Sequence, residues 1–200
     1  MNNQTFIQRY FVQVEEAIAA GQQFESARAT EEALLHYNVA LAILEVLAAG
    51  TNEKHRLQQL LAHVHDRLGR IYLVGLDCTK AANHLETAVV GYDRLFGGGN
   101  RRSFEMTVLL AEACVRGGQA VAGQAAAKAA AALLEQVEGY CGPSAAYAYY
   151  WLYRSEMILE NQEAAAAAAS KMGAYLVANP DLLNNGTFGL LLREVATLKG

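Results

Sequence analysis

Histidine and cysteine are the residue types in this chain with the widest chemical range, since both can bind metals and act on protons. The chain has five histidines and three cysteines. His63 and His65 are two positions apart, so on a helix their side chains would point about 200° away from each other. A shared metal ion would need the i, i+4 spacing of H-E-x-x-H, and no Cys-x-x-Cys pair occurs. The spacing therefore predicts no metal site.

Motifs for phosphate binding and acid–base catalysis are equally weak. The glycine run 97–99 lacks the following Lys-Ser/Thr of a phosphate loop, and we interpret it as a flexible connector. Asp66 with Glu86, or Glu105 with Glu112, could be considered carboxylate pairs, but on charged helices they indicate a solvated face. There is also no G-x-S-x-G. We expect a non-enzymatic protein without catalytic residues or a cofactor.

Composition indicates what kind of elements hold these side chains. Apolar residues make up 53% of the 200 residues, only two prolines occur, and alanine is abundant. Alanine has the best helix propensity and proline is excluded from helix interiors, so an all-α fold is predicted. The net charge is −4 and no basic stripe is present, which argues against nucleic acid as a partner.

The cellular setting is predicted from the same composition. The three cysteines are odd in number and far apart, which argues against a disulfide framework and favours a reducing compartment. The first residues show neither a charged segment nor an apolar segment typical of a secretory signal. No uncharged apolar run reaches about 18 residues, so we expect no membrane insertion. These features predict a cytoplasmic location.

Turn residues divide the chain into candidate helices. Glycine, asparagine and proline clusters predict nine of them, at about 4–28, 30–49, 52–75, 78–96, 101–117, 119–138, 144–160, 162–178 and 183–198. Thr30, Asn100, Ser144 and Asn161 are predicted N-caps because their side chains can accept from the free amides of a first helical turn. The short loops predict that successive helices are antiparallel neighbours.

A spaced pattern of small and aromatic residues occurs twice. It reads Ala20-Gly21-x-x-Phe24 followed by Ala33-x-x-x-Tyr37-x-x-Ala40, and again Leu68-Gly69-x-x-Tyr72 followed by Ala81-x-x-x-Leu85-x-x-Ala88. This pattern resembles the tetratricopeptide repeat, a pair of helices with small residues at their crossing. In the second copy we expect the side chains of Tyr72 and Leu85 to fill the space beside Gly69.

A longer period continues the pattern. Leu68, Leu110 and Leu152 recur at intervals of 42 positions, and their surroundings resemble the longer tetratricopeptide repeats of kinesin light chains. The resemblance implies one domain over residues 1–200, a right-handed α-solenoid of antiparallel helix pairs. Its repeats would be about 5–49, 52–96, 101–138 and 144–178, with a capping helix at 183–198. In the fourth repeat Tyr153 stands where a small residue is expected, so helix 144–160 is rotated or the register differs.

The resemblance also implies where a partner binds. In tetratricopeptide arrays the first helices line a concave groove, and by that register its residues here are His63, Asp66, Arg70, Glu105, Glu112, Tyr147, Tyr150 and Arg154. Asp66 and Arg70 replace the Lys and Asn with which related co-chaperones hold a carboxylate terminus. We therefore expect a different partner, a peptide or amphipathic helix of another protein, anchored by the aromatic and basic cluster around Tyr150 and Arg154 unless those rings are core.

Other functions stay open at this point. One is a regulatory domain that senses a ligand or peptide. Another is a trafficking adaptor, because the segment 1–75 also resembles the microtubule-interacting and trafficking domain through Ala33-x-x-x-Tyr37-x-x-Ala40. The alanine runs 125–127, 129–132 and 164–169 predict either close packing inside the solenoid or a flat face for a homo-oligomer.

Overall fold

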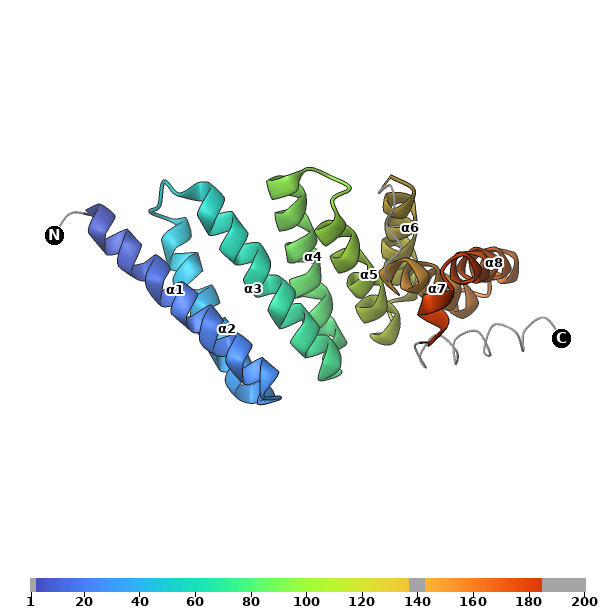
Figure 1. Ribbon diagram of the computed structural model, residues 1–200, viewed down its shortest axis with the longest axis horizontal. Helices are drawn as coiled ribbons and strands as arrows, with labels where there is room; N and C mark the ends of the chain where they lie inside the picture. The colour runs from blue at the N-terminus through green and yellow to red at the C-terminus, as the bar shows by residue number, and fades with distance from the viewer. Residues whose placement is uncertain (1–2, 137–142, 185–200) are drawn as a thin grey trace. The chain divides into compact units, whose positions relative to one another are not determined.

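The computed structural model describes residues 3–136 and 143–184, which form eight α-helices and one short 3-10 helix (Figure 1). No strand occurs within these residues. The helices are α1 (Asn3–Ser26), α2 (Thr30–Ala48), α3 (Lys54–Val74), α4 (Cys78–Phe96), α5 (Arg101–Arg116), α6 (Ala120–Gln136), α7 (Pro143–Ile158) and α8 (Gln162–Ala178), followed by η1 (Pro180–Asn184). The all-α prediction is confirmed, and consecutive helices pack against each other from α1 to α4 and from α5 to α8.

The predicted helix boundaries agree with the structure to within two residues for the first eight helices. The agreement arises because propensity and turn residues act locally, within one or two helical turns. The predicted capping helix at 183–198 lies outside the described residues, except for the last two residues of η1.

Two helices begin with a side-chain cap. Asn100 accepts from the amide of Ser103 at 2.9 Å, as predicted, and Asp77 accepts from the amide of Lys80 at 3.1 Å, which the sequence analysis missed. Each cap satisfies a first-turn amide that has no partner within its own helix.

Two predicted caps are wrong, and a third is right in position but lacks the expected side-chain bond. Thr30 is the first residue of α2 and Ala29 precedes it as the cap, while Ser144 lies inside α7. Asn161 does occupy the cap position of α8, but its side chain makes no capping bond. Its amide donates to the carboxylate of Glu156 at 2.8 Å instead, a tertiary contact that the local sequence could not reveal.

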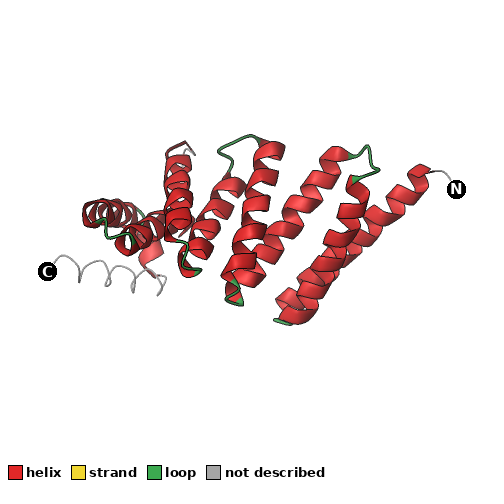
Figure 2. Cartoon of the chain, turned by 180° about the vertical axis from the view of Figure 1, so that it is seen from behind, coloured by secondary structure: helices red, strands yellow, loops and turns green. Residues whose placement is uncertain are grey.

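The chain divides into two compact units, residues 1–98 and 99–200, and each is described by itself. Unit 1 contains α1 to α4, and unit 2 contains α5 to α8 with η1. In unit 1 the connections alternate between the two ends of the helices, so that each helix runs antiparallel to the one before it (Figure 1). Figure 2 shows the same helices from behind.

Four turns of identical construction join α1 to α2, α3 to α4, α5 to α6, and α7 to α8. Each contains one residue with positive φ, namely Arg28, Leu76, Gly118 and Glu160. In each, the next amide bonds to the carbonyl five residues back, the closure that ends many helices. These residues are spaced by 48, 42 and 42 positions, so the turns confirm an internal repeat of helix pairs.

Glycines allow the first two pairs to approach closely. A Cβ atom on Gly69 would lie 2.7 Å from Cγ of Leu85, and one on Gly21 would lie 2.9 Å from Cζ of Tyr37. Both partners are fully buried and follow their glycine by 16 positions. In the third pair the close approach lies at Gly123, whose added Cβ would be 2.5 Å from Cγ2 of Val115.

In the fourth pair, the large residue lies on the first helix of the contact and the small residue lies on the second. Tyr153 of α7 takes the position of the glycine, and Ala169 of α8 takes the position of the large side chain, again 16 positions later. Both are buried in one apolar cluster. A large residue facing a small one fills the same space with the roles reversed, so Tyr153 is compatible with the predicted register.

The aromatic residue of the pattern is only partly buried. Tyr72 stacks on His84 with ring centroids 5.5 Å apart, and Phe24 stacks on His36 at 5.2 Å. Leu85 fills the space beside Gly69 as expected, whereas Tyr72 packs at the edge of the core of unit 1.

Candidate functional site

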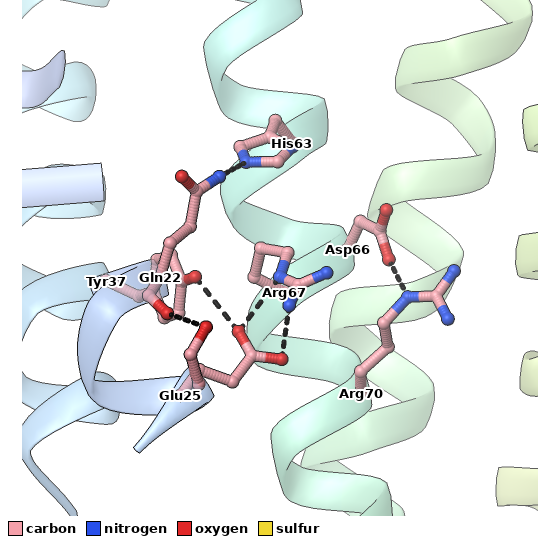
Figure 3. A network of polar contacts seen from close by, with 8 residues as sticks. Gln22, Glu25, Tyr37, His63, Asp66, Arg67 and Arg70 are labelled. Atoms are coloured by element: carbon pink, nitrogen blue, oxygen red, sulfur yellow. Dashed lines mark hydrogen bonds and ion pairs between the residues drawn. The ribbon is translucent and has the colours of Figure 1, made fainter. Parts of the chain in front are cut away.

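The predicted groove residues of unit 1 lie on one face of α3, because spacings of three and four return to the same side of a helix. The side chains of His63, Asp66 and Arg70 are already engaged there (Figure 3). Arg70 donates to Asp66, and the other oxygen of Asp66 accepts from the hydroxyl of Tyr92 at 3.3 Å. His63 lies 3.3 Å from the amide nitrogen of Gln22 on α1.

A stronger contact that the sequence analysis missed connects α1 to α3. Arg67 donates through two nitrogens to the carboxylate of Glu25, and Tyr37 of α2 donates its hydroxyl to the same carboxylate at 3.0 Å (Figure 3). The Arg67 and Glu25 side chains are each 28% exposed. Two parallel bonds make this pair stronger than a simple ion pair. The available signal was the position of Glu25, one turn after the glycine that contacts Tyr37.

The hydroxyl of Tyr37 completes this three-helix network as a hydrogen-bond donor. The pKa of Tyr37 is raised to about 12, mainly by burial. The hydrogen bond with Arg67 lowers this pKa, whereas the charge of Glu25 raises it. The hydroxyl therefore stays protonated at neutral pH. The network holds α1, α2 and α3 together beside the predicted groove.

Arg56 ties the start of α3 to the first half of α1. Its guanidinium lies 2.6 Å from a carboxylate oxygen of Glu15 and 4.5 Å from the ring centre of Phe11. It also contacts Glu53 at 3.4 Å. The polar face between α1 and α3 is thus cross-linked along its length by side chains.

A pocket of about 360 Å³ opens at the end of this face, where α1 turns into α2. It is lined by Glu25, Arg28, Thr30, Ala33, Arg70, Ile71 and Val74. Ala33 and Ile71 are buried and form an apolar floor, while the charged residues form the rim. Glu25 is neutralised by Arg67 and Arg70 by Asp66, whereas Arg28 has no ion-pair partner within the described residues.

The pocket can therefore accept an apolar group that carries a carboxylate or another anion. The apolar part would gain from leaving water at Ala33 and Ile71. The anion would meet the guanidinium of Arg28 at the rim.

Two histidines face each other on the other side of α3. Nδ1 of His65 and Nδ1 of His84 are 2.9 Å apart, so one ring donates and the other accepts. The pKa of His65 is lowered to about 4, mainly by burial and in addition by the charge of the nearby His84. The pKa of His84 is also lowered, first by burial and then by the charge of Lys80. Both rings are neutral at pH 7. Across residues 3–136 and 143–184, no group of three His, Cys, Asp or Glu side chains is placed to hold a metal ion.

In unit 2 the predicted groove residues of α5 form ion pairs along their own helix. Glu105 pairs with Arg101 at 2.9 Å, and Glu112 pairs with Arg116 at 2.7 Å. Such exposed i, i+4 pairs stabilise a helix by only about 0.3–0.5 kcal/mol. Both carboxylates stay near the surface.

The predicted aromatic anchor on α7 is largely core. Tyr150 is only 7% exposed and packs edge-on against Trp151 and beside Tyr153. Arg154 donates to the hydroxyl of Tyr150 at 3.4 Å, and Tyr147 is half-buried in the same region. The structure thus favours the alternative in which these rings pack inside unit 2.

Each alanine run has both buried and exposed members. Ala127, Ala130, Ala165 and Ala168 are buried inside unit 2, whereas their neighbours 125, 129, 166 and 167 are exposed. Close packing therefore accounts for part of each run.

Unit 2 also contains a buried carboxylate that the sequence analysis did not identify. Glu156 is 1% exposed and accepts from Gln124 at 2.8 Å, from Asn161 at 2.8 Å and from Lys128 at 3.1 Å. Burial raises the pKa of Glu156, but the three hydrogen bonds outweigh this and the net pKa is lowered. The anion therefore links α6, α7 and the start of α8.

No protein-family model matches the chain, and a search of the curated proteins finds no relative. Within the described residues, no helix is long and apolar enough to cross a membrane. The resemblance to tetratricopeptide repeats therefore stays a prediction that rests on the residues themselves.

Proposed function

We propose that this chain is a non-enzymatic protein-recognition module of the cytoplasm, which binds a peptide of a partner protein along the face of α1 and α3. The proposal includes tetratricopeptide-like pairing of the helices and right-handed stacking. The observation that supports it is the pocket beside Arg70, a residue that the repeat register assigns to the partner-binding groove.

The pocket favours a particular kind of peptide. Its buried apolar floor suits an aliphatic side chain, and Arg28 at its rim suits an acidic residue next to that side chain. The cross-links Glu25–Arg67 and Glu15–Arg56 hold the surrounding helices in place before a peptide arrives. A rigid site loses less entropy on binding.

Charge reversal at Arg28 tests this proposal. Arg28→Glu removes the cation from the rim, and glutamate is compatible with this turn because Glu160 has the same φ of 60° at the equivalent turn of unit 2. The amount of partner that the variant retains should fall about tenfold or more, as expected when a charged contact is reversed. The measurement is quantitative mass spectrometry of proteins retained from native lysate.

Glu160→Arg provides the matched control, since it makes the opposite exchange in the same kind of turn. It should retain the partner as the wild type does. Equal retention by Arg28→Glu and the wild type would remove the pocket from the proposal.

A second candidate is a regulatory domain that senses a small ligand. The volume of about 360 Å³ lies within the range of small-molecule sites, which favours this alternative. It predicts that a panel of small apolar carboxylates contains members that raise the melting temperature of the wild type but not of Arg28→Glu. A panel without any such member would exclude carboxylate sensing at this pocket.

A further inference from the structure

Helix α2 is apolar on two opposite faces. Its inner face is buried in the core of unit 1 and consists of Ala33, Tyr37, Ala40, Leu44 and Leu47. Its outer face is exposed and carries a second apolar row, Leu35, Val39, Ala42 and Val46, which the C-cap residue Ala49 continues. Leu35 is 63% exposed and Val46 is 68% exposed. We call this second row the α2 stripe.

The fold of the helix pair does not require the α2 stripe. The equivalent positions of α4, which follow at an offset of 48 positions, are Asn83, Thr87, Val90 and Arg94, and these are exposed and mostly polar. Both helices close against their partner through the same glycine contact, at Gly21 and Gly69. A solvated outer face is therefore sufficient for this architecture, and the apolar residues on α2 have another cause.

The spacing of the stripe is that of a helix-pairing seam. Its members are separated by four, three, four and three positions, the heptad pattern in which one helix packs along another. The row extends over most of α2, so it offers a continuous contact for an added helix.

Acidic residues flank the α2 stripe on both sides. Glu31, Glu32 and Glu45 are exposed and form no ion pair within the described residues. Helix α2 itself contains no lysine or arginine. Two copies of α2 placed side by side would bring these carboxylates together, and like charges across an interface are unfavourable.

We propose that the α2 stripe docks an amphipathic helix of a partner protein, with an apolar row at heptad spacing and lysine or arginine beside it. The apolar rows would bury each other, and the basic residues would pair with Glu31, Glu32 and Glu45. This surface shares no residue with the pocket at Arg28 and Arg70, so it does not depend on the function proposed above.

The test uses a synthetic peptide of about 21 residues, three heptads, with leucine at the seam and lysine beside it. A second peptide replaces each lysine by glutamate. Fluorescence anisotropy should show saturable binding of the lysine peptide to the full chain, weakened by salt because exposed charges are screened. The glutamate peptide should bind at least about tenfold more weakly.

Two variants separate the apolar and the charged parts of the surface. Leu35→Asn/Val39→Thr introduces the residues that α4 has at the same positions, so folding should be retained, and binding should fall at least about tenfold. Glu32→Gln/Glu45→Gln should weaken binding several-fold and reduce its salt dependence. The control Asn83→Ala/Glu86→Gln on α4, and Arg28→Glu at the pocket, should bind as the wild type does.

Three outcomes would overturn the proposal. One is the absence of saturable binding by the lysine peptide. Another is equal binding by the wild type and Leu35→Asn/Val39→Thr. The third is a wild-type dimer in sedimentation experiments that Leu35→Asn/Val39→Thr converts to monomer, since this would assign the α2 stripe to a second copy of the chain.

Discussion

At the residue scale, the paired rings of His65 and His84 link α3 to α4, and partial burial favours the neutral form of both. One ring must accept from the other, and the ammonium group of Lys80 lies over the adjacent Tyr72 ring, 5.2 Å from its centre. An added proton on either ring would place positive charge in a partly buried site, and with both rings cationic neither nitrogen could accept. The pair should therefore make unit 1 sensitive to acid.

The expected pH dependence follows from the lowered pKa of His65, about 4, against about 6.5 for an unfolded histidine. Because the folded pKa lies below the unfolded one, this contribution to stability is complete above about pH 6.5 and is lost as the pH falls towards about 4. Between about pH 7.5 and pH 5, the free energy of unfolding in urea should fall by on the order of 1 kcal/mol.

Variants can assign that loss to the pair. His65→Gln/His84→Gln should flatten the pH dependence, whatever its effect on stability at neutral pH. His55→Ala, at an exposed position, should leave the dependence unchanged. A double variant with the same slope as the wild type would contradict this assignment.

Leu76 has a backbone conformation that costs energy, although its side chain is largely exposed to solvent. Its φ is 65° and its side chain is 70% exposed, while Gly118 occupies the same place in the next turn. The left-handed conformation costs a non-glycine residue roughly 1–2 kcal/mol, partly offset by the greater freedom of an unfolded glycine.

Leu76→Gly should therefore raise the free energy of unfolding by roughly 0.5 kcal/mol, and Gly118→Leu should lower it by about 1 kcal/mol or more. Urea unfolding of both variants measures the two changes. A less stable Leu76→Gly variant would show that the Leu76 side chain makes a contribution larger than the backbone cost.

At the element scale, the contact between α3 and α4 depends on the absence of a side chain at Gly69. An added Cβ would lie 2.7 Å from Cγ and 3.3 Å from the backbone nitrogen of Leu85, so either the leucine or the whole helix must move. Overpacking of this kind typically costs about 1–3 kcal/mol.

Gly69→Ala should lower the free energy of unfolding by that amount despite the higher helix propensity of alanine. Gly173→Ala in α8 is the matched control, because nothing lies within 4 Å of its added Cβ. The control should be stabilised by up to about 1 kcal/mol. If both variants gain stability in urea unfolding, the close approach of α3 and α4 is wrong.

A double-variant cycle with Leu85→Ala measures the contact directly. Once Leu85 is truncated, Gly69→Ala should cost less than in the wild type, since the Cβ then meets open space. The pair Tyr153 and Ala169 already shows that a large residue is tolerated on the first helix when the second helix has a small one.

At the scale of the whole molecule, unit 1 has the interactions of an independently folding domain. One apolar cluster of its core extends from Ile7 to Tyr72, and buried residues of α4 add to that core. Its ion pairs Arg67–Glu25 and Arg56–Glu15 lie entirely within residues 1–98. Compact segments with their own core fold alone as a rule.

A fragment of residues 1–98 should therefore be helical by circular dichroism and unfold cooperatively in urea. It should also retain the acid sensitivity of the histidine pair, because both rings belong to it. A fragment with helical content but no cooperative transition would show that unit 1 needs the rest of the chain.

The sequence by itself determined the elements and their repetition. Helix propensity and turn residues act over a few residues, so the eight helices could be predicted from local pattern. The close contacts at Gly21 and Gly69 follow the spacing of the small residues, whereas those at Gly123 and Tyr153 appeared only in the structure. The period of 42 positions reappears as equal turns at Leu76, Gly118 and Glu160.

Only the tertiary structure decided which polar and apolar side chains meet. Glu25 and Arg67 are 42 positions apart, His65 and His84 are 19 apart, and no local pattern relates them. Whether a helix face is covered also depends on neighbours: the rings around Tyr150 are buried, while the outer face of α2 is left to solvent. Sequence periodicity identifies an apolar face, but only the packing of other elements shows whether that face already has a partner.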